Sequence, residues 1–258
     1  MRKGVKMTSV LAIITIVCSI LTLSSCSEEE ELTAQDIALK KSIVGKWKTY
    51  SINGNPGITN NKGVITYYSD GTFTSTTFRN KKWECSDNYK YYLNGSSYIE
   101  VNSNYTVKAV ISSISDDEIV YSDFANNKGF KCENMVSHKI TADYSKDIIG
   151  LWEGVEMTGE STHGTADHRW EYRADGSYTY FTKDADGNWV ADESNSGNEY
   201  YVDGDFFGSR WIKDGKENRE WWDIEKCDGK EMVWSALRRT SNGKVFSTKM
   251  VLRKIASI

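Results

Sequence analysis

The sequence predicts an all-β protein made of two tandem eight-stranded up-and-down antiparallel β-barrels. Three observations support this prediction: one opening motif occurs twice, Asp-Gly and Asn-Gly turns separate short alternating segments, and only one short segment looks helical. The 258 residues are 39% hydrophobic and 12% aromatic with a single Pro, which is the composition of a folded chain. The net charge of −4, without a basic stretch interleaved with aromatics, predicts no nucleic-acid partner.

Residues 1–25 are expected to be a signal peptide. Three basic residues precede an apolar run, VLAIITIVCSILTL, that is too short to span a bilayer comfortably. The following stretch LSSC, which ends at Cys26, resembles the lipobox of bacterial lipoprotein signals. That resemblance implies that residues 1–25 are removed and that Cys26 is lipidated, so that the chain contacts a membrane through this anchor. The alternatives are an ordinary signal peptide or a membrane anchor.

Residues 26–32 are expected to form an acidic lipidated tether. The residues after Cys26 are SEEEE, and no Asp follows the cysteine directly, so the inner-membrane retention signal of the usual model is absent. The acidic run also resembles the surface-export signal of some Gram-negative lipoproteins. These resemblances imply an outer-membrane protein displayed at the cell surface. The periplasmic face of the outer membrane, with the acidic run as a solvated spacer, is the alternative.

One helix is expected, over the segment TAQDIALKK from Thr33 to Lys41. Thr33 and Asp36 have the spacing of a capping box, in which each side chain accepts a hydrogen bond from the other's backbone N–H. No interior helix fits after it, because the strands that follow use up the remaining length.

Two domains are predicted, over residues 33–141 and 142–258, because the chain repeats itself. The stretch IVGKW at residues 43–47 reappears as IIGLW at residues 148–152, an offset of 105, and the turn at Asp70-Gly71 reappears at Asp175-Gly176 with the same offset. Later landmarks drift to offsets of 113 and 115, as hairpin loops of different length require. With the Gly and the Trp of the opening motif, the Asp-Gly turn, and the aromatic pair Phe73 and Tyr178, four landmarks share the offset of 105, which indicates an internal duplication.

Each copy is expected to contain about eight strands joined by hairpins. The segment HRWEYRA alternates apolar and charged residues, as a half-buried strand does, and the following Asp-Gly supplies the positive φ that tight hairpin turns need. Closure into a barrel would remove the exposed edges. The expected strands start near residues 44, 63, 72, 88, 97, 105, 118 and 128, and near residues 150, 168, 177, 198, 206, 217, 230 and 244.

The motifs of both copies resemble those of the lipocalin superfamily. The pattern GKW…YYSDGTF…YYLNGSSYIEV…ISDDEIVY, echoed as GLW…YRADGSY…YYVDG…EMVW, is similar to the compact lipocalin-like domains of bacterial surface lipoproteins. The resemblance implies that each Gly-x-Trp plugs one end of its barrel, with a basic side chain from the last strand over the Trp ring. Lys139, and Arg253 or Lys254, are the candidates. Both copies are shorter than classical lipocalins, so the resemblance does not imply a deep ligand cavity.

No enzyme, metal or cofactor is expected. His163 and His168 flank a loop beside Asp167, but no rigid element holds them at a metal-binding spacing. The stretch starting at Asp184 begins like a calcium loop and lacks both the required Gly and the closing Glu, which favours a turn. Motifs for nucleophilic catalysis or phosphate binding do not occur. A disulfide between Cys85 and Cys132 is possible, and the sequence does not decide whether it forms.

The expected function is the binding of a small apolar or amphipathic ligand in the second copy. Seven of the nine Trp lie there, and smaller residues often replace its rings in the first copy, as Ile65 does for Trp170. The predicted ligand-binding residues are Trp170, Tyr172, Tyr178, Tyr180, Trp222 and Trp234. The alternative is a non-enzymatic structural or interaction lipoprotein whose barrels are filled and which contacts envelope or host proteins or glycans.

Trp221 is a candidate for a protein or glycan contact. It neighbours Trp222 in one strand, so that the two side chains face opposite sides. If Trp222 points inward with Ile224, Trp221 points outward, where it could also pack on the other barrel.

Overall fold

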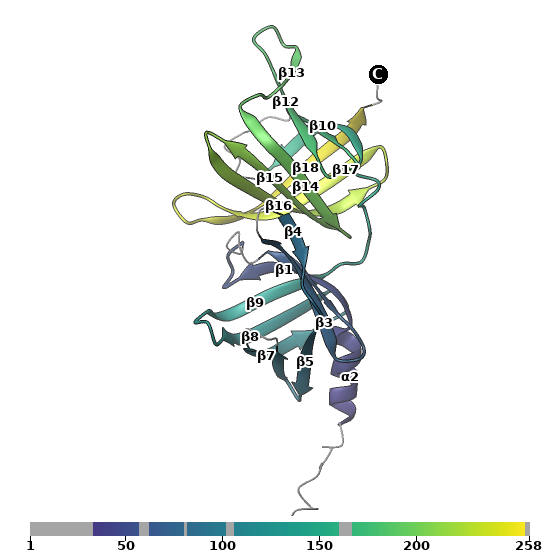
Figure 1. Ribbon diagram of the computed structural model, residues 1–258, viewed down its shortest axis with the longest axis vertical. Coiled ribbons are helices and arrows are strands. Elements are labelled where there is room, and N and C mark those ends of the chain that lie inside the picture. Colours follow the sequence, from purple (N-terminus) through teal and green to yellow (C-terminus); the bar gives the residue numbers. More distant parts are fainter. Residues whose placement is uncertain (1–32, 57–61, 80–81, 102–105, 160–166, 256–258) are drawn as a thin grey trace, which may run out of the picture. The chain divides into compact units, whose positions relative to one another are not determined.

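The computed structural model describes residues 33–56, 62–79, 82–101, 106–159 and 167–255. The signal peptide, the acidic tether with Cys26, and His163 lie outside these residues. Among the described residues, no helix is long and apolar enough to cross a membrane. Figure 1 follows the chain from the short purple helix through the teal and green strands to the last yellow strand.

Helix α2 (Ala34–Ile43) confirms the one helix that the sequence predicts. The Asp36 backbone N–H donates to Thr33 Oγ1 at 3.1 Å, and the Thr33 backbone N–H donates to Asp36 Oδ2 at 3.0 Å. This reciprocal pair is the expected capping box, and it satisfies two N–H groups that the first helical turn would leave without partners.

The first sheet closes into an eight-stranded barrel. All of its ladders are antiparallel, and the pairing of β2 with β3 joins the two ends of the strand order β2-β1-β9-β8-β7-β6-β5-β3. A ninth strand, β4, extends the barrel beside β3 and was not predicted, because its four residues give too short an alternation to recognise. The strands are β1 (Gly45–Ile52), β2 (Gly63–Tyr67), β3 (Thr72–Arg79), β4 (Lys82–Cys85), β5 (Tyr89–Asn94), β6 (Ser97–Val101), β7 (Thr106–Ile114), β8 (Glu118–Asn126) and β9 (Lys131–Lys139).

The second sheet repeats this up-and-down topology, but its two ends are not joined by a continuous ladder, and this open junction is called the seam. Its order is β13-β12-β11-β10-β18-β17-β16-β15-β14. The strands are β10 (Gly150–Thr158), β11 (Arg169–Tyr172), β12 (Tyr178–Lys183), β13 (Trp189–Ala191), β14 (Asn195–Asp203), β15 (Phe206–Lys213), β16 (Lys216–Cys227), β17 (Glu231–Arg239) and β18 (Val245–Ile255). The prediction of two tandem all-β barrels is confirmed, with nine strands rather than eight in each sheet.

The seam lies between β12 and β14. Only the start of β12 touches β14: Ser177 forms an isolated bridge with Glu199, and the Tyr200 N–H donates to the Gly176 carbonyl at 2.7 Å. Further along, β12 pairs instead with the unpredicted strand β13 through a hairpin at Asp184. The ladder therefore stays open beyond the bridge, at the point where the candidate site begins. Asp184 accepts hydrogen bonds from the backbone N–H groups of residues 186 and 188, which confirms a turn there.

The first Gly-x-Trp closes its barrel as expected. The Trp47 side chain is buried, and its indole N–H donates to the Ile43 carbonyl at 2.7 Å. Lys139 Nζ lies 5.1 Å from the Trp47 ring centroid, within the range of a cation–π contact. Gly45 has a φ of 133°, which an L side chain rarely adopts.

The second Gly-x-Trp repeats this arrangement. The Trp152 indole N–H donates to the Ile148 carbonyl at 2.6 Å, and Lys254 Nζ lies 5.1 Å from the ring centroid. Gly150 has a φ of 130°, which an L side chain rarely adopts, and a Cβ atom added there would approach Lys254 Cε to 2.7 Å, so the lysine side chain would have to shift. Of the two candidate basic residues, Lys254 is the one that covers the ring.

Phenols and a carboxyl group fill part of the first barrel. Tyr67, Tyr98 and Tyr121 are buried, with the Tyr67 hydroxyl 2.6 Å from that of Tyr98 and 3.3 Å from that of Tyr121. The Tyr98 hydroxyl donates to Glu100, which is 5% exposed. Burial raises the pKa of Glu100 to about 7, although the hydrogen bonds from Tyr98 and Tyr67 oppose this change.

A separate hydrophobic cluster contains Trp221. Residues 38–258 form one compact unit, and within it Trp221 packs with Val64, Phe78 and Phe206 and is only 8% exposed. Its ring centroid lies 5.2 Å from that of Trp83 in β4. The side chain does point away from Trp222, but it packs on residues of the first copy. This packing on the other copy is the alternative that the sequence analysis left open, and a protein or glycan contact through Trp221 stays a prediction.

The three described cysteines are free thiols. Cys85 is exposed, whereas Cys132 and Cys227 are buried. The disulfide that the sequence left open between Cys85 and Cys132 is thus not formed.

Candidate ligand-binding site

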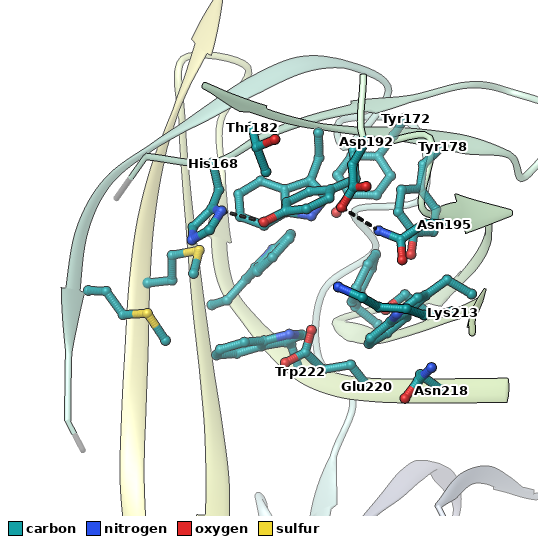
Figure 2. A pocket seen from close by; sticks show the side chains of 18 residues that line it. His168, Tyr172, Tyr178, Thr182, Asp192, Asn195, Lys213, Asn218, Glu220 and Trp222 are labelled. Carbon is teal, nitrogen blue, oxygen red and sulfur yellow. Dashed lines mark hydrogen bonds between the residues drawn. The ribbon is translucent and has the colours of Figure 1, made fainter. Parts of the chain in front are cut away.

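A cavity of about 440 Å³ lies in the second barrel, within the range of small-molecule sites. Figure 2 shows side chains converging on it from several strands. All six residues that the sequence predicted to bind a ligand line this cavity. The full lining is Met157, His168, Trp170, Tyr172, Tyr178, Tyr180, Thr182, Asp192, Asn195, Phe207, Ser209, Trp211, Lys213, Asn218, Glu220, Trp222, Trp234 and Met250.

Strand alternation brings the aromatic residues to one face. Trp170 and Tyr172 are two residues apart in β11, and Tyr178 and Tyr180 are two residues apart in β12. Side chains at this spacing share a face of the sheet. Antiparallel pairing then sets Trp170 opposite Tyr180 and Tyr172 opposite Tyr178, so four rings form one contiguous wall.

Trp234 lies at the centre of the aromatic lining. Its ring stacks on Phe207 with centroids 5.0 Å apart and planes 20° apart. The Trp222 ring lies 5.5 Å away and the Trp170 ring 5.6 Å away. Aromatic pairs at these separations attract each other beyond the burial of their area, by about 0.5–1.5 kcal/mol each. Neighbouring rings therefore hold Trp234 in place, which preorganises this wall for a ligand.

Polar side chains gather at the seam and along the ends of β15 and β16. Asn195 Nδ2 donates to Asp192 Oδ2 at 3.0 Å, and the Tyr180 hydroxyl is hydrogen-bonded to His168 Nδ1. Figure 2 shows Lys213, Asn218 and Glu220 grouped together on another side of the cavity. The lining thus combines an apolar aromatic wall with donors and acceptors that can orient a ligand.

Burial and nearby carboxylates keep the cavity phenols protonated. Burial is the first cause that raises the pKa of Tyr180 to about 12, followed by the negative charges of Asp192 and Glu220. Burial and then Glu220 also raise the pKa of Tyr178. Neutral phenols both donate and accept hydrogen bonds, so they can serve either kind of ligand group.

The histidine that sequence analysis considered for metal binding has a different partner. His168 is hydrogen-bonded to Tyr180, and its ring stacks with that phenol at a centroid distance of 5.5 Å. Within the described parts of the chain, no three His, Cys, Asp or Glu side chains are grouped so that they could hold a metal ion.

Sequence reasoning missed the lining contributed by β15. Phe207, Ser209 and Trp211 alternate along this strand and all face the cavity. The stretch FFGSRW carries that alternation, so the signal was present in the sequence. Asp192 and Asn195 could not be found in this way, because they reach the cavity only through the unpredicted β12–β13 hairpin.

Comparisons with known proteins identify no family. No family model matches the chain, and no curated protein matches it. Among solved structures, the chain is similar to a protein of unknown function from the DUF3598 family of Nostoc punctiforme PCC 73102. The two share 10% sequence identity, with 87% of this chain and 100% of that chain covered, at a TM-score of 0.24. So low a score carries no argument, and the site rests on the chain's own geometry.

Proposed function

We propose that the second barrel binds one small, planar, apolar or amphipathic molecule, and that the protein acts as a non-enzymatic, lipocalin-like binding protein. The observation that carries this proposal is the 440 Å³ cavity lined by preorganised aromatic rings. An eight-stranded barrel is wide enough either to be filled by side chains or to hold one small ligand. Here the rings line a space rather than fill it.

For the first barrel, the side-chain packing supports the alternative role, that of a filled, structural barrel. Its core contains the hydrogen-bonded Tyr67, Tyr98 and Tyr121, which pack against one another. We therefore assign the first barrel a structural role. A chain with both barrels filled, acting only through its surface, is the competing function.

Ligand binding is testable by tryptophan fluorescence. The second copy contains seven of the nine Trp, and four of them line the cavity: Trp170, Trp211, Trp222 and Trp234. Titration with a fatty acid, a retinoid or an aromatic glycoside is expected to give saturable quenching or a spectral shift with at least one of them. If all three classes leave the emission spectrum unchanged, the filled-barrel function is favoured.

We also propose that the protein is anchored in the outer membrane by lipid on Cys26 and displayed at the cell surface. The lipobox and the acidic run at Glu28–Glu31 support this address. Cys26→Ala is expected to abolish labelling by radioactive palmitate, and labelling of that variant would refute lipidation. Replacing the four Glu with Ala is expected to reduce protease cleavage on intact cells. Unchanged cleavage would remove surface export and leave lipidation standing.

A further inference from the structure

The cavity of the second barrel opens at the end where β15 turns into β16. Along β15, the lining residues pass from buried Phe207 through half-buried Trp211 to exposed Lys213. Along β16, they pass from half-buried Asn218 to buried Trp222. The ladder pairs Phe207 with Trp222 and Trp211 with Asn218, so exposure increases in both strands toward the same end. A ligand reaches the cavity from this end.

This open end, called the mouth, is more polar than the closed end. At the closed end, the rings of Phe207 and Trp234 stack on each other. At the mouth, Asn195 lies opposite Lys213 in the ladder of β14 and β15, and its amide donates to Asp192. The mouth is lined by Asp192, Asn195, Trp211, Lys213, Asn218 and Glu220. An amphipathic ligand therefore has one favourable orientation, with its apolar part at the closed end and its polar part at the mouth.

The mouth offers both hydrogen-bond donors and hydrogen-bond acceptors to the polar part of a ligand. Lys213 donates, and the Asn218 amide contains groups of both kinds, while the carboxylates of Asp192 and Glu220 accept. Glu220 already accepts from Arg238 at 3.2 Å, but a carboxylate has further lone pairs. Figure 2 shows Lys213, Asn218 and Glu220 grouped together. Because hydroxyl groups both donate and accept, several hydroxyls on one ring can use this mixed set. A ligand carboxylate only accepts, so it would use Lys213 and leave the acceptors of the mouth without a ligand contact.

Trp211 adds a flat apolar face to these polar groups. Its side chain is half-buried and lies beside Asn218 in the ladder. Among the described residues, no other aromatic ring packs on Trp211, whereas the rings of Trp222 and Trp234 have centroids only 5.5 Å apart. The Trp211 ring is therefore available to a ligand. The C–H groups on one face of a sugar ring are weakly positive and pack on the negative face of an aromatic ring, while the sugar hydroxyls around the edge reach polar side chains.

We propose that the cavity binds a glycoside, with its flat apolar group among the rings of the closed end and its sugar ring at the mouth. The sugar stacks on Trp211 and exchanges hydrogen bonds with Lys213, Asn218 and Glu220. This inference rests on the proposed binding function and names its ligand class. It disfavours the same apolar group without a sugar, and the same group with a carboxylate in place of the sugar.

The test uses four ligands that share one apolar ring system: 2-naphthyl β-D-glucoside, 2-naphthyl β-D-galactoside, 2-naphthyl methyl ether and 2-naphthoxyacetate. Dissociation constants are measured by equilibrium dialysis, with the naphthyl fluorescence of each compartment as the readout. At least one glycoside is expected to bind about tenfold more tightly than the methyl ether, because the sugar adds more than one net hydrogen bond. The same glycoside is expected to bind more tightly than the oxyacetate.

The position of the sugar is tested with Trp211→Ala and Asn218→Ala. At least one of these variants is expected to reduce the preference for the glycoside over the methyl ether to about twofold or less, with the affinity for the methyl ether unchanged. That unchanged affinity shows that the variant barrel is folded. Trp189→Ala is the matched control, because Trp189 lies in β13 outside the cavity lining and contacts Arg169 and Lys183. This control should keep the wild-type preference.

The outcomes separate this inference from the proposed function. If the methyl ether or the oxyacetate binds at least as tightly as both glycosides, the inference is overturned and the function stands. If none of the four ligands binds, the inference is overturned, and the fatty-acid and retinoid titrations then decide the function. A glycoside preference that survives in both Trp211→Ala and Asn218→Ala also overturns the inference, because the sugar then lies elsewhere than at the mouth.

Discussion

Trp234→Ala is expected to lower the free energy of unfolding by about 3–5 kcal/mol, the usual cost of removing a buried large ring. The Trp234 side chain is 2% exposed and contacts the rings of Phe207, Trp222 and Trp170, so its loss leaves a void that the barrel cannot easily close. Ligand binding should weaken as well, by about 1–3 kcal/mol, if the ring contacts the ligand. Urea unfolding measures the first effect. Equilibrium dialysis of whichever fatty acid, retinoid or aromatic glycoside changes the tryptophan emission measures the second.

Trp189→Ala is the matched control for this prediction. Trp189 is half-buried, lies outside the cavity lining, and makes cation–π contacts with Arg169 and Lys183. Loss of the two cation–π contacts is expected to cost only about 0.5–1 kcal/mol each, because Trp189 is partly open to solvent, and binding should not change. If Trp234→Ala destabilises the protein but leaves the affinity for that ligand unchanged, Trp234 is a core residue and the filled-barrel function is favoured.

Glu100→Gln is expected to remove a pH dependence of stability that originates in the first barrel. The pKa of Glu100 is raised by burial from 4.5 to about 7 in the folded protein, so the folded state keeps its proton after the unfolded chain has lost it. Stability is therefore greatest at low pH and declines as the pH rises through this window. The loss is on the order of 3 kcal/mol, since each pKa unit corresponds to about 1.4 kcal/mol.

The variant isolates this contribution because Gln is neutral in both states and still accepts the Tyr98 hydrogen bond. Urea unfolding of wild type and variant at about pH 4 and about pH 8 should show the variant gaining on the wild type as the pH rises. Glu156→Gln is the control, because Glu156 is exposed, and it should track the wild type. A constant gap between wild type and Glu100→Gln at both pH values would contradict a raised folded-state pKa.

Much of the fold follows from local signals in the sequence. The repeated Gly-x-Trp and the Asp-Gly turns require specific backbone geometry, so they mark strand starts and hairpins closely in both copies. The strands β4 and β13 are only four and three residues long, which is too short for alternation to reveal. The seam between β12 and β14 could not be predicted either. It forms because β12 pairs with β13, while only an isolated bridge connects its start to β14.

The candidate site also has one part that the sequence predicts and another part that it does not. Its aromatic wall could be predicted, since strand alternation alone sets Trp170, Tyr172, Tyr178 and Tyr180 on one face. Asp192 and Asn195 could not be predicted, because they reach the cavity only through the β12–β13 hairpin. Trp221 shows the limit of alternation: the pattern gives its side of the strand but not what covers that side.

Native mass spectrometry of the protein purified from its own host tests most directly whether the second barrel holds a ligand. The expected spectrum contains the chain with the added mass of one small molecule, and Trp234→Ala is expected to show less of this complex at the same concentration. A spectrum with only the bare chain, unchanged when a fatty acid, a retinoid or an aromatic glycoside is supplied, would contradict a ligand-binding cavity.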